Sequence, residues 1–101
     1  MRRSSELLSV ARELASISRR AQGRSDLAGG ASRLRAIEQV LDGRSRAAVL
    51  ESRTLLETAA ARLPSDAERL VLNQSLARAR SEVLREYQLE QRQLRQLHAP
   101  R

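Results

Sequence analysis

The chain carries four stretches in which Leu, Ile, Val and Ala recur at alternating steps of three and four residues. That spacing places the apolar side chains on one face of an α-helix, whereas a half-buried strand would alternate at every second residue. Residues that interrupt helices, such as Gly43 and Pro64, separate the stretches. The pattern therefore predicts an all-α protein.

The second stretch has two alternative starts. Asp26 can cap a helix there, but Gly29 and Gly30 follow it, and each costs about 1 kcal/mol relative to Ala in a helix interior. The helix is therefore expected to begin at Asp26 or at Ser32. In both cases Asp42–Gly43 is expected to end it.

The third and fourth stretches have clearer boundaries. Ser45 is predicted to cap the third, and Pro64 to end it, because the residue before a proline disfavours the helical conformation. Ser65 and Glu68 then have the spacing of a capping box, in which each side chain accepts a hydrogen bond from the other residue's backbone N–H. No further helix breaker occurs before Pro100.

The last stretch is much longer than the other three. A helix from Asp66 to Leu97 measures about 48 Å, so three short helices cover only part of it. Short connections favour antiparallel neighbours. We therefore expect an antiparallel helical bundle of three short helices plus one long C-terminal helix. Residues 1–85 form the bundle, and residues 86–101 project as a coiled-coil-like arm or fray.

The composition predicts a thin core. Of 101 residues 17 are Leu and 15 are Ala, and Tyr87 is the only aromatic residue. Alanine buries little apolar area, so a chain of this length gains from packing against a second surface. Together with the long last helix, this favours a chain that binds a helical protein partner or forms a homodimer.

The predicted partner-binding residues lie towards the end of the last stretch. Apolar residues continue the helical spacing there, interrupted by Glu90, and nearby arginines are expected to select the partner by pairing with carboxylates. The alternative is that these side chains pack on the chain's own bundle or lie on a frayed end. The residues are Val83, Arg85, Tyr87, Leu89, Arg92, Leu94, Arg95 and Leu97.

The residues that carry chemistry are few. The chain has no Cys, which excludes thiol catalysis and disulfides, and the single histidine, His98, is expected to be solvated. Glu82, Glu86 and Glu90 share a helical stripe, but neighbouring arginines indicate a solvated face rather than a cation site. We therefore expect no enzymatic activity, no cofactor, no metal and no small-molecule substrate.

The net charge of +7 raises nucleic-acid binding as the alternative function. All 19 basic residues are Arg, and the excess lies at the two ends, because residues 25–77 carry no net charge. A basic helix can follow a phosphate backbone. Against this reading, the arginines are scattered, glutamates lie between them, and aromatic residues for base stacking are nearly absent.

No apolar run approaches the roughly 20 residues that span a bilayer, and no signal-peptide core is present. We therefore expect no membrane span and a cytoplasmic location. In size and composition the chain resembles small helical chaperones and coiled-coil subunits of bacterial secretion or flagellar export systems, although no motif supports a family. The predicted function is a non-enzymatic helical adaptor or chaperone-like protein of such a system.

Overall fold

Each of the four apolar stretches forms one α-helix, which confirms the predicted all-α fold. The structure is a computed structural model that describes residues 2–20 and 23–98, and it contains no strand within these ranges. The helices are α1 (Arg2–Arg20), α2 (Arg24–Glu38), α3 (Gly43–Ala61) and α4 (Asp66–His98). The long last helix is therefore continuous to His98.

The start of α2 corresponds to the earlier of the two predicted alternatives. Gly23 is the N-cap residue, and its backbone N–H donates to Asp26 Oδ2 at 3.4 Å. Asp26 thus stabilises the start of the helix from its third position, where a carboxylate also suits the helix dipole. The helix begins two residues before Asp26, at Arg24, and not at Ser32.

Gly30 lies where three helices come close together. A Cβ added there would stand 3.1 Å from Ile17 Cγ2 on α1 and 3.5 Å from Leu56 Cδ1 on α3. A Cβ at Gly29 would meet no atom within 4 Å. The tight packing of α2 against its neighbours therefore explains why residue 30 is glycine, but it does not explain Gly29.

The connection between α2 and α3 differs from the prediction. The α2 helix ends at Glu38, before the expected Asp42–Gly43 signal, and α3 already begins at Gly43 with Asp42 as its N-cap. Gly43 has φ +57°, a left-handed conformation that favours glycine. Ser45 is therefore not the cap: it lies inside the first turn and its side chain is buried.

The connection between α3 and α4 follows the prediction. Arg62 is extended at the end of α3, close to Pro64. The backbone N–H of Ser65 donates to Glu68 Oε1 at 3.0 Å, and that of Glu68 donates to Ser65 Oγ at 3.2 Å. The capping box is thus confirmed. These bonds from Ser65 also hold the pKa of Glu68 below its ordinary value.

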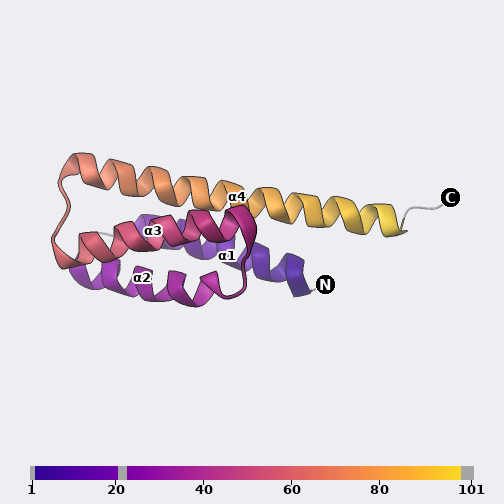
Figure 1. The fold of residues 1–101 in the computed structure, drawn as a ribbon, viewed down its shortest axis with the longest axis horizontal. Coiled ribbons are helices and arrows are strands. Elements are labelled where there is room, and N and C mark those ends of the chain that lie inside the picture. Colours follow the sequence, from indigo (N-terminus) through magenta and orange to yellow (C-terminus); the bar gives the residue numbers. More distant parts are fainter. Residues whose placement is uncertain (1, 21–22, 99–101) are drawn as a thin grey trace.

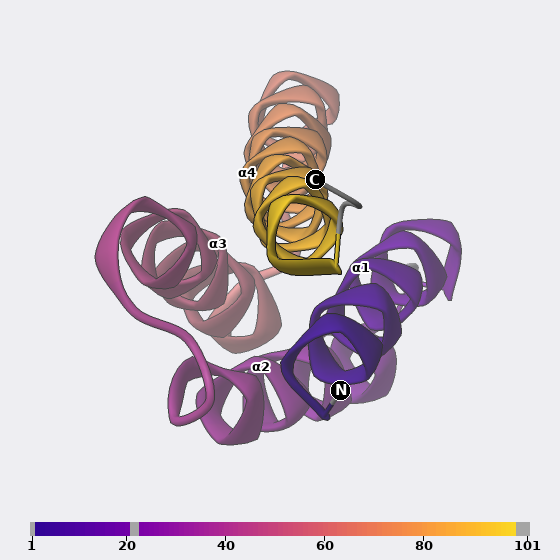
Figure 2. The same ribbon diagram turned by 90° about the vertical axis from the view of Figure 1, so that its right-hand side faces the viewer.

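The helices alternate in direction along the 57 Å axis of the molecule (Figure 1). Viewed along this axis, α4 lies opposite α2, with α1 and α3 between them (Figure 2). Two contacts show that α3 and α4 run antiparallel. Ser45, near the start of α3, lies against Glu86, whereas Ser52, further along α3, lies against Ser75, which is nearer the start of α4. The main helix pairs are α1 with α4, α2 with α3, and α3 with α4.

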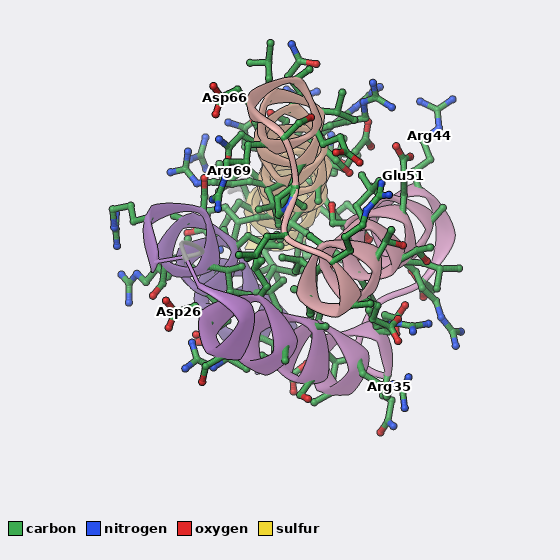
Figure 3. The ribbon with its side chains drawn as sticks, turned by 90° about the vertical axis from the view of Figure 1, so that its left-hand side faces the viewer. Asp26, Arg35, Arg44, Glu51, Asp66 and Arg69 are labelled. Carbon is green, nitrogen blue, oxygen red and sulfur yellow. The ribbon has the colours of Figure 1, made fainter. Side chains whose placement is uncertain are left out.

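The core consists of aliphatic side chains from all four helices, and charged side chains such as Asp26, Arg35 and Arg44 point outward (Figure 3). The Ser52 and Ser75 hydroxyls lie 2.9 Å apart within it, between α3 and α4. The largest fully buried apolar side chains are Leu7, Leu14, Leu27, Leu34, Leu56, Leu76, Val49 and Val83.

Candidate protein-binding surfaces

The α4 helix leaves the bundle near Glu86. Ser45, in the first turn of α3, has its Oγ 2.5 Å from Glu86 Oε2, so α3 begins level with this point of α4. Figure 1 shows α4 continuing past the ends of both α1 and α3. Among the described residues of α4, Val83 is the last that is buried, and Tyr87 packs half-buried against the core. We call residues 88–98 the C-terminal arm.

Two residues predicted to bind a partner belong to the bundle itself. Val83 is fully buried, with 0% of its surface exposed, and so has no surface to offer a partner. Tyr87 lies at the rim of the same core. The reason is that α3 reaches as far along α4 as Glu86, so the α4 side chains that face the bundle are covered up to about this point.

The apolar face of α4 continues onto the arm. Glu90, Leu94 and Leu97 follow Val83 by seven, eleven and fourteen residues, so they lie on the same side of the helix. Glu90 and Leu94 are half-buried, whereas Leu97 is 78% exposed. With the neighbouring Gln91, these residues form a surface that we call the inner face of the arm.

The other predicted residues do not lie on the inner face. Arg92 is two residues from both Glu90 and Leu94, which places it on the opposite side of the helix. Arg85 lies seven residues before Arg92 and shares its side, and Leu89 lies between them at 48% exposure. Arg95 is also exposed. These arginines thus lie beside or opposite the inner face, and their role in selecting a partner stays a prediction.

A second open apolar surface lies at the other end of α4, and sequence reasoning missed it. A hollow of about 230 Å³ opens between the end of α3 and the start of α4. Its floor includes the core residues Ala59 and Leu72, and Val71 beside it is 52% exposed. The lining residues, which we call the corner groove, are Leu55, Thr58, Ala59, Arg62, Pro64, Ala67, Glu68, Val71 and Leu72.

The sequence does contain a signal for this groove. Leu70, Val71 and Leu72 are consecutive apolar residues at the start of a helix, and successive residues point about 100° apart. A single neighbouring layer cannot cover all three side chains. Leu72 faces the core, and Leu70 and Val71 remain exposed.

Among the described residues, a connected group of charged contacts lies between α2 and α3. Arg53 donates from Nε to Glu38 Oε2 at 2.8 Å and from Nη1 to Glu57 Oε1 at 2.6 Å, and Arg35 donates to Glu57 at 3.3 Å. The hydrogen bond to Glu38 raises the pKa of Arg53 above its already high ordinary value. Glu38 is only 7% exposed, and its Oε1 makes no hydrogen bond with the described residues. Every acid of this group has an arginine partner, which fits a structural role.

No group of three or more His, Cys, Asp or Glu side chains that could hold a metal ion occurs in the described residues. In the same part of the chain, no helix combines the length and the apolar character needed to cross a membrane. The side chain of His98 lies outside the described residues.

No protein-family model, curated protein or solved structure matches this chain. Its function is therefore inferred from the two open apolar surfaces, the inner face of the arm and the corner groove.

Proposed function

We propose that the protein is a non-enzymatic helical adaptor or chaperone-like protein that binds a partner through helix packing. One observation carries this proposal: the apolar face of α4 continues past the bundle onto an arm, where Leu97 is 78% exposed. A single apolar residue at a surface is common, but a face that continues a core and then loses its cover is typical of helix-in-groove or coiled-coil binding.

The corner groove supports the same proposal from the other end of the molecule. It offers an apolar floor between two helices, which suits one side chain of an incoming helix. Because the long axis measures 57 Å, the arm and the groove lie far enough apart to serve two separate contacts. A protein with two such surfaces can connect two partners, and its size and composition suit a bacterial secretion or export system.

Site-directed photo-cross-linking in the host tests the proposal with the full chain. A photo-reactive aromatic amino acid replaces Leu97 on the arm, Val71 at the groove or, as a control, the exposed Gln74 in the first half of α4. Cross-linked products are expected from positions 97 and 71. If these positions give no more product than position 74, neither surface binds protein and the proposal fails.

The alternative, nucleic-acid binding, has one observation in its favour. Arg78, Arg85 and Arg92 are exposed and spaced seven residues apart along α4, although Arg78 also pairs with Glu51 of α3 at 3.8 Å. Such a row can contact a phosphate backbone. A gel shift at physiological salt decides: binding that disappears in the Arg85→Glu/Arg92→Glu variant supports the alternative, and no binding of the wild type removes it.

A further inference from the structure

We propose that a second copy of this chain covers the inner face of the arm, with the two arms packed antiparallel. This inference rests on the proposed function, because it names the partner of the same surface. The inner face, Glu90, Gln91, Leu94 and Leu97, would then lie between the two arms.

Continuity with the α3–α4 interface is the first argument. On α4, the positions that face α1 and α3 are followed along the same side by Glu90, Leu94 and Leu97. The α3 helix begins at Gly43, level with Glu86, so it does not reach these residues. A helix that packs against the inner face would therefore contact the same side of α4 that α1 and α3 contact earlier along the helix.

The direction of the second copy follows from the space available. The chain's own α1, α2 and α3 lie beside the part of α4 that precedes the arm (Figures 1 and 2), and helical spacing from the buried Val83 places the inner face on that same side. A second α4 packed parallel on this side would bring its own bundle into the same space. Packed antiparallel, the second bundle lies beyond the end of the arm, where it meets no such obstacle.

The small net charge of the arm is the third argument. The chain carries +7, yet the arm contains only one Glu and two Arg, so residues 88–98 carry a net charge of +1. Two arms therefore repel each other only weakly, whereas a strongly acidic or basic partner would gain little here. Gln91 on the inner face supplies both donors and an acceptor, which can pair with the polar groups of an identical arm.

The size of the arm sets the expected strength. Eleven helical residues span about 16 Å at 1.5 Å per residue. Stable interfaces bury about 1,200–2,000 Å² in total, and a single pair of such short helices buries less. We therefore expect a weak dimer with a dissociation constant on the order of 100 μM.

The carboxylate of Glu90 predicts how a substitution on the inner face changes the strength of the dimer. It is half-buried on the inner face and makes no hydrogen bond or ion pair with the described residues. Covering this carboxylate by a second arm opposes dimerisation, because a charge leaving water without a partner is disfavoured. The Glu90→Leu variant is therefore expected to dimerise about tenfold more tightly than the wild type.

Distances between spin labels test the direction of the arms. The chain has no Cys, so single cysteines introduced at Gln93, Gln88 or Ser81 each give one label per copy. For antiparallel arms centred on Gln93, the axial separation between the two labels is near zero at Gln93, about 15 Å at Gln88 and about 36 Å at Ser81. Equal distances at all three positions would mean parallel arms and would overturn the proposal.

Sedimentation equilibrium up to about 1 mM tests which residues form the contact. The Leu94→Asp/Leu97→Asp variant is expected to be monomeric with its helical circular dichroism intact. The Leu89→Asp variant, altered on another side of the arm, is the matched control and should dimerise like the wild type. The inference is wrong if the wild type is monomeric, or if Leu89→Asp weakens dimerisation as much as Leu94→Asp/Leu97→Asp does.

The outcome also separates this inference from the proposed function. If the wild type is monomeric but position 97 cross-links to a different helical protein, the inference that a second copy binds the arm is wrong and the adaptor proposal stands. If positions 97 and 71 both cross-link to nothing and the chain is monomeric, both fail.

Discussion

Ser45 Oγ lies 2.5 Å from Glu86 Oε2, joining the first turn of α3 to α4 at the point where the arm begins. The same oxygen is 3.0 Å from the Asp42 carbonyl, and Ser45 is only 3% exposed. One buried hydroxyl therefore connects the N-terminus of α3, the preceding connection and the last part of α4 that the bundle covers.

The first prediction concerns this hydroxyl. The Ser45→Ala variant should unfold with a free energy about 1–2 kcal/mol lower than the wild type, because Glu86 loses a buried donor. Ser81→Ala, at an exposed position of α4, is the control and should change little. Urea unfolding followed by circular dichroism measures both. Equal stabilities of the two variants would show that the contact contributes nothing.

The two glycines of α2 give the second prediction. Gly29→Ala should stabilise the protein by about 1 kcal/mol, because alanine favours the helix and the added methyl group meets open space. Gly30→Ala should lack this gain, because its methyl group would stand 3.1 Å from Ile17 Cγ2. Thermal unfolding of both variants is the measurement, and equal gains would contradict the close approach of α1 and α2.

The capping box gives a prediction about pH. Hydrogen bonds from Ser65 lower the pKa of Glu68 in the folded state. A depressed folded pKa means that Glu68 contributes stability above its unfolded pKa of about 4.3, and this contribution is lost as the pH falls through the folded pKa. The Glu68→Gln variant should therefore lose less stability than the wild type between about pH 5 and pH 3. Parallel pH profiles of the two proteins would contradict this.

The Arg53 network gives a fourth prediction. Arg53→Met removes the only described partner of the buried Glu38 carboxylate and should lower the thermal midpoint by several degrees. Arg33→Met breaks an exposed contact with Glu13 and should leave the midpoint nearly unchanged. The double variant Glu38→Met/Arg53→Met should recover much of the loss. A double variant as unstable as Arg53→Met would show that the buried charge is not the cause.

Local chain signals predicted the elements of the fold well. The Ser65–Glu68 capping box and Pro64 act within a few residues, so their effect could be recognised without knowledge of the packing. The start of α2 was ambiguous because the reason for Gly30 lies in Ile17 and Leu56, which are distant in sequence. Periodicity alone cannot supply such a contact.

The candidate surfaces were harder to predict. Val83 and Leu97 occupy the same helical stripe, and only the position where α3 begins shows that one is core and the other exposed. Ser45 looked like a cap because a serine precedes an apolar run, but the left-handed Gly43 starts the helix earlier. The corner groove needs two helices to form, and the run Leu70-Val71-Leu72 was its only trace in the sequence.

Hydrogen exchange of the arm amides at two protein concentrations tests the central claim, that the inner face of the arm binds a second copy, most directly. An uncovered helix end opens readily, so residues 88–98 should exchange fast in dilute solution, while the core of α4 around Leu76 and Ala79 stays protected. At concentrations near 1 mM, on the order of ten times the expected dissociation constant, the arm amides should slow markedly, whereas those of the core keep their rates. Arm amides that exchange at the same rate at both concentrations would contradict the account.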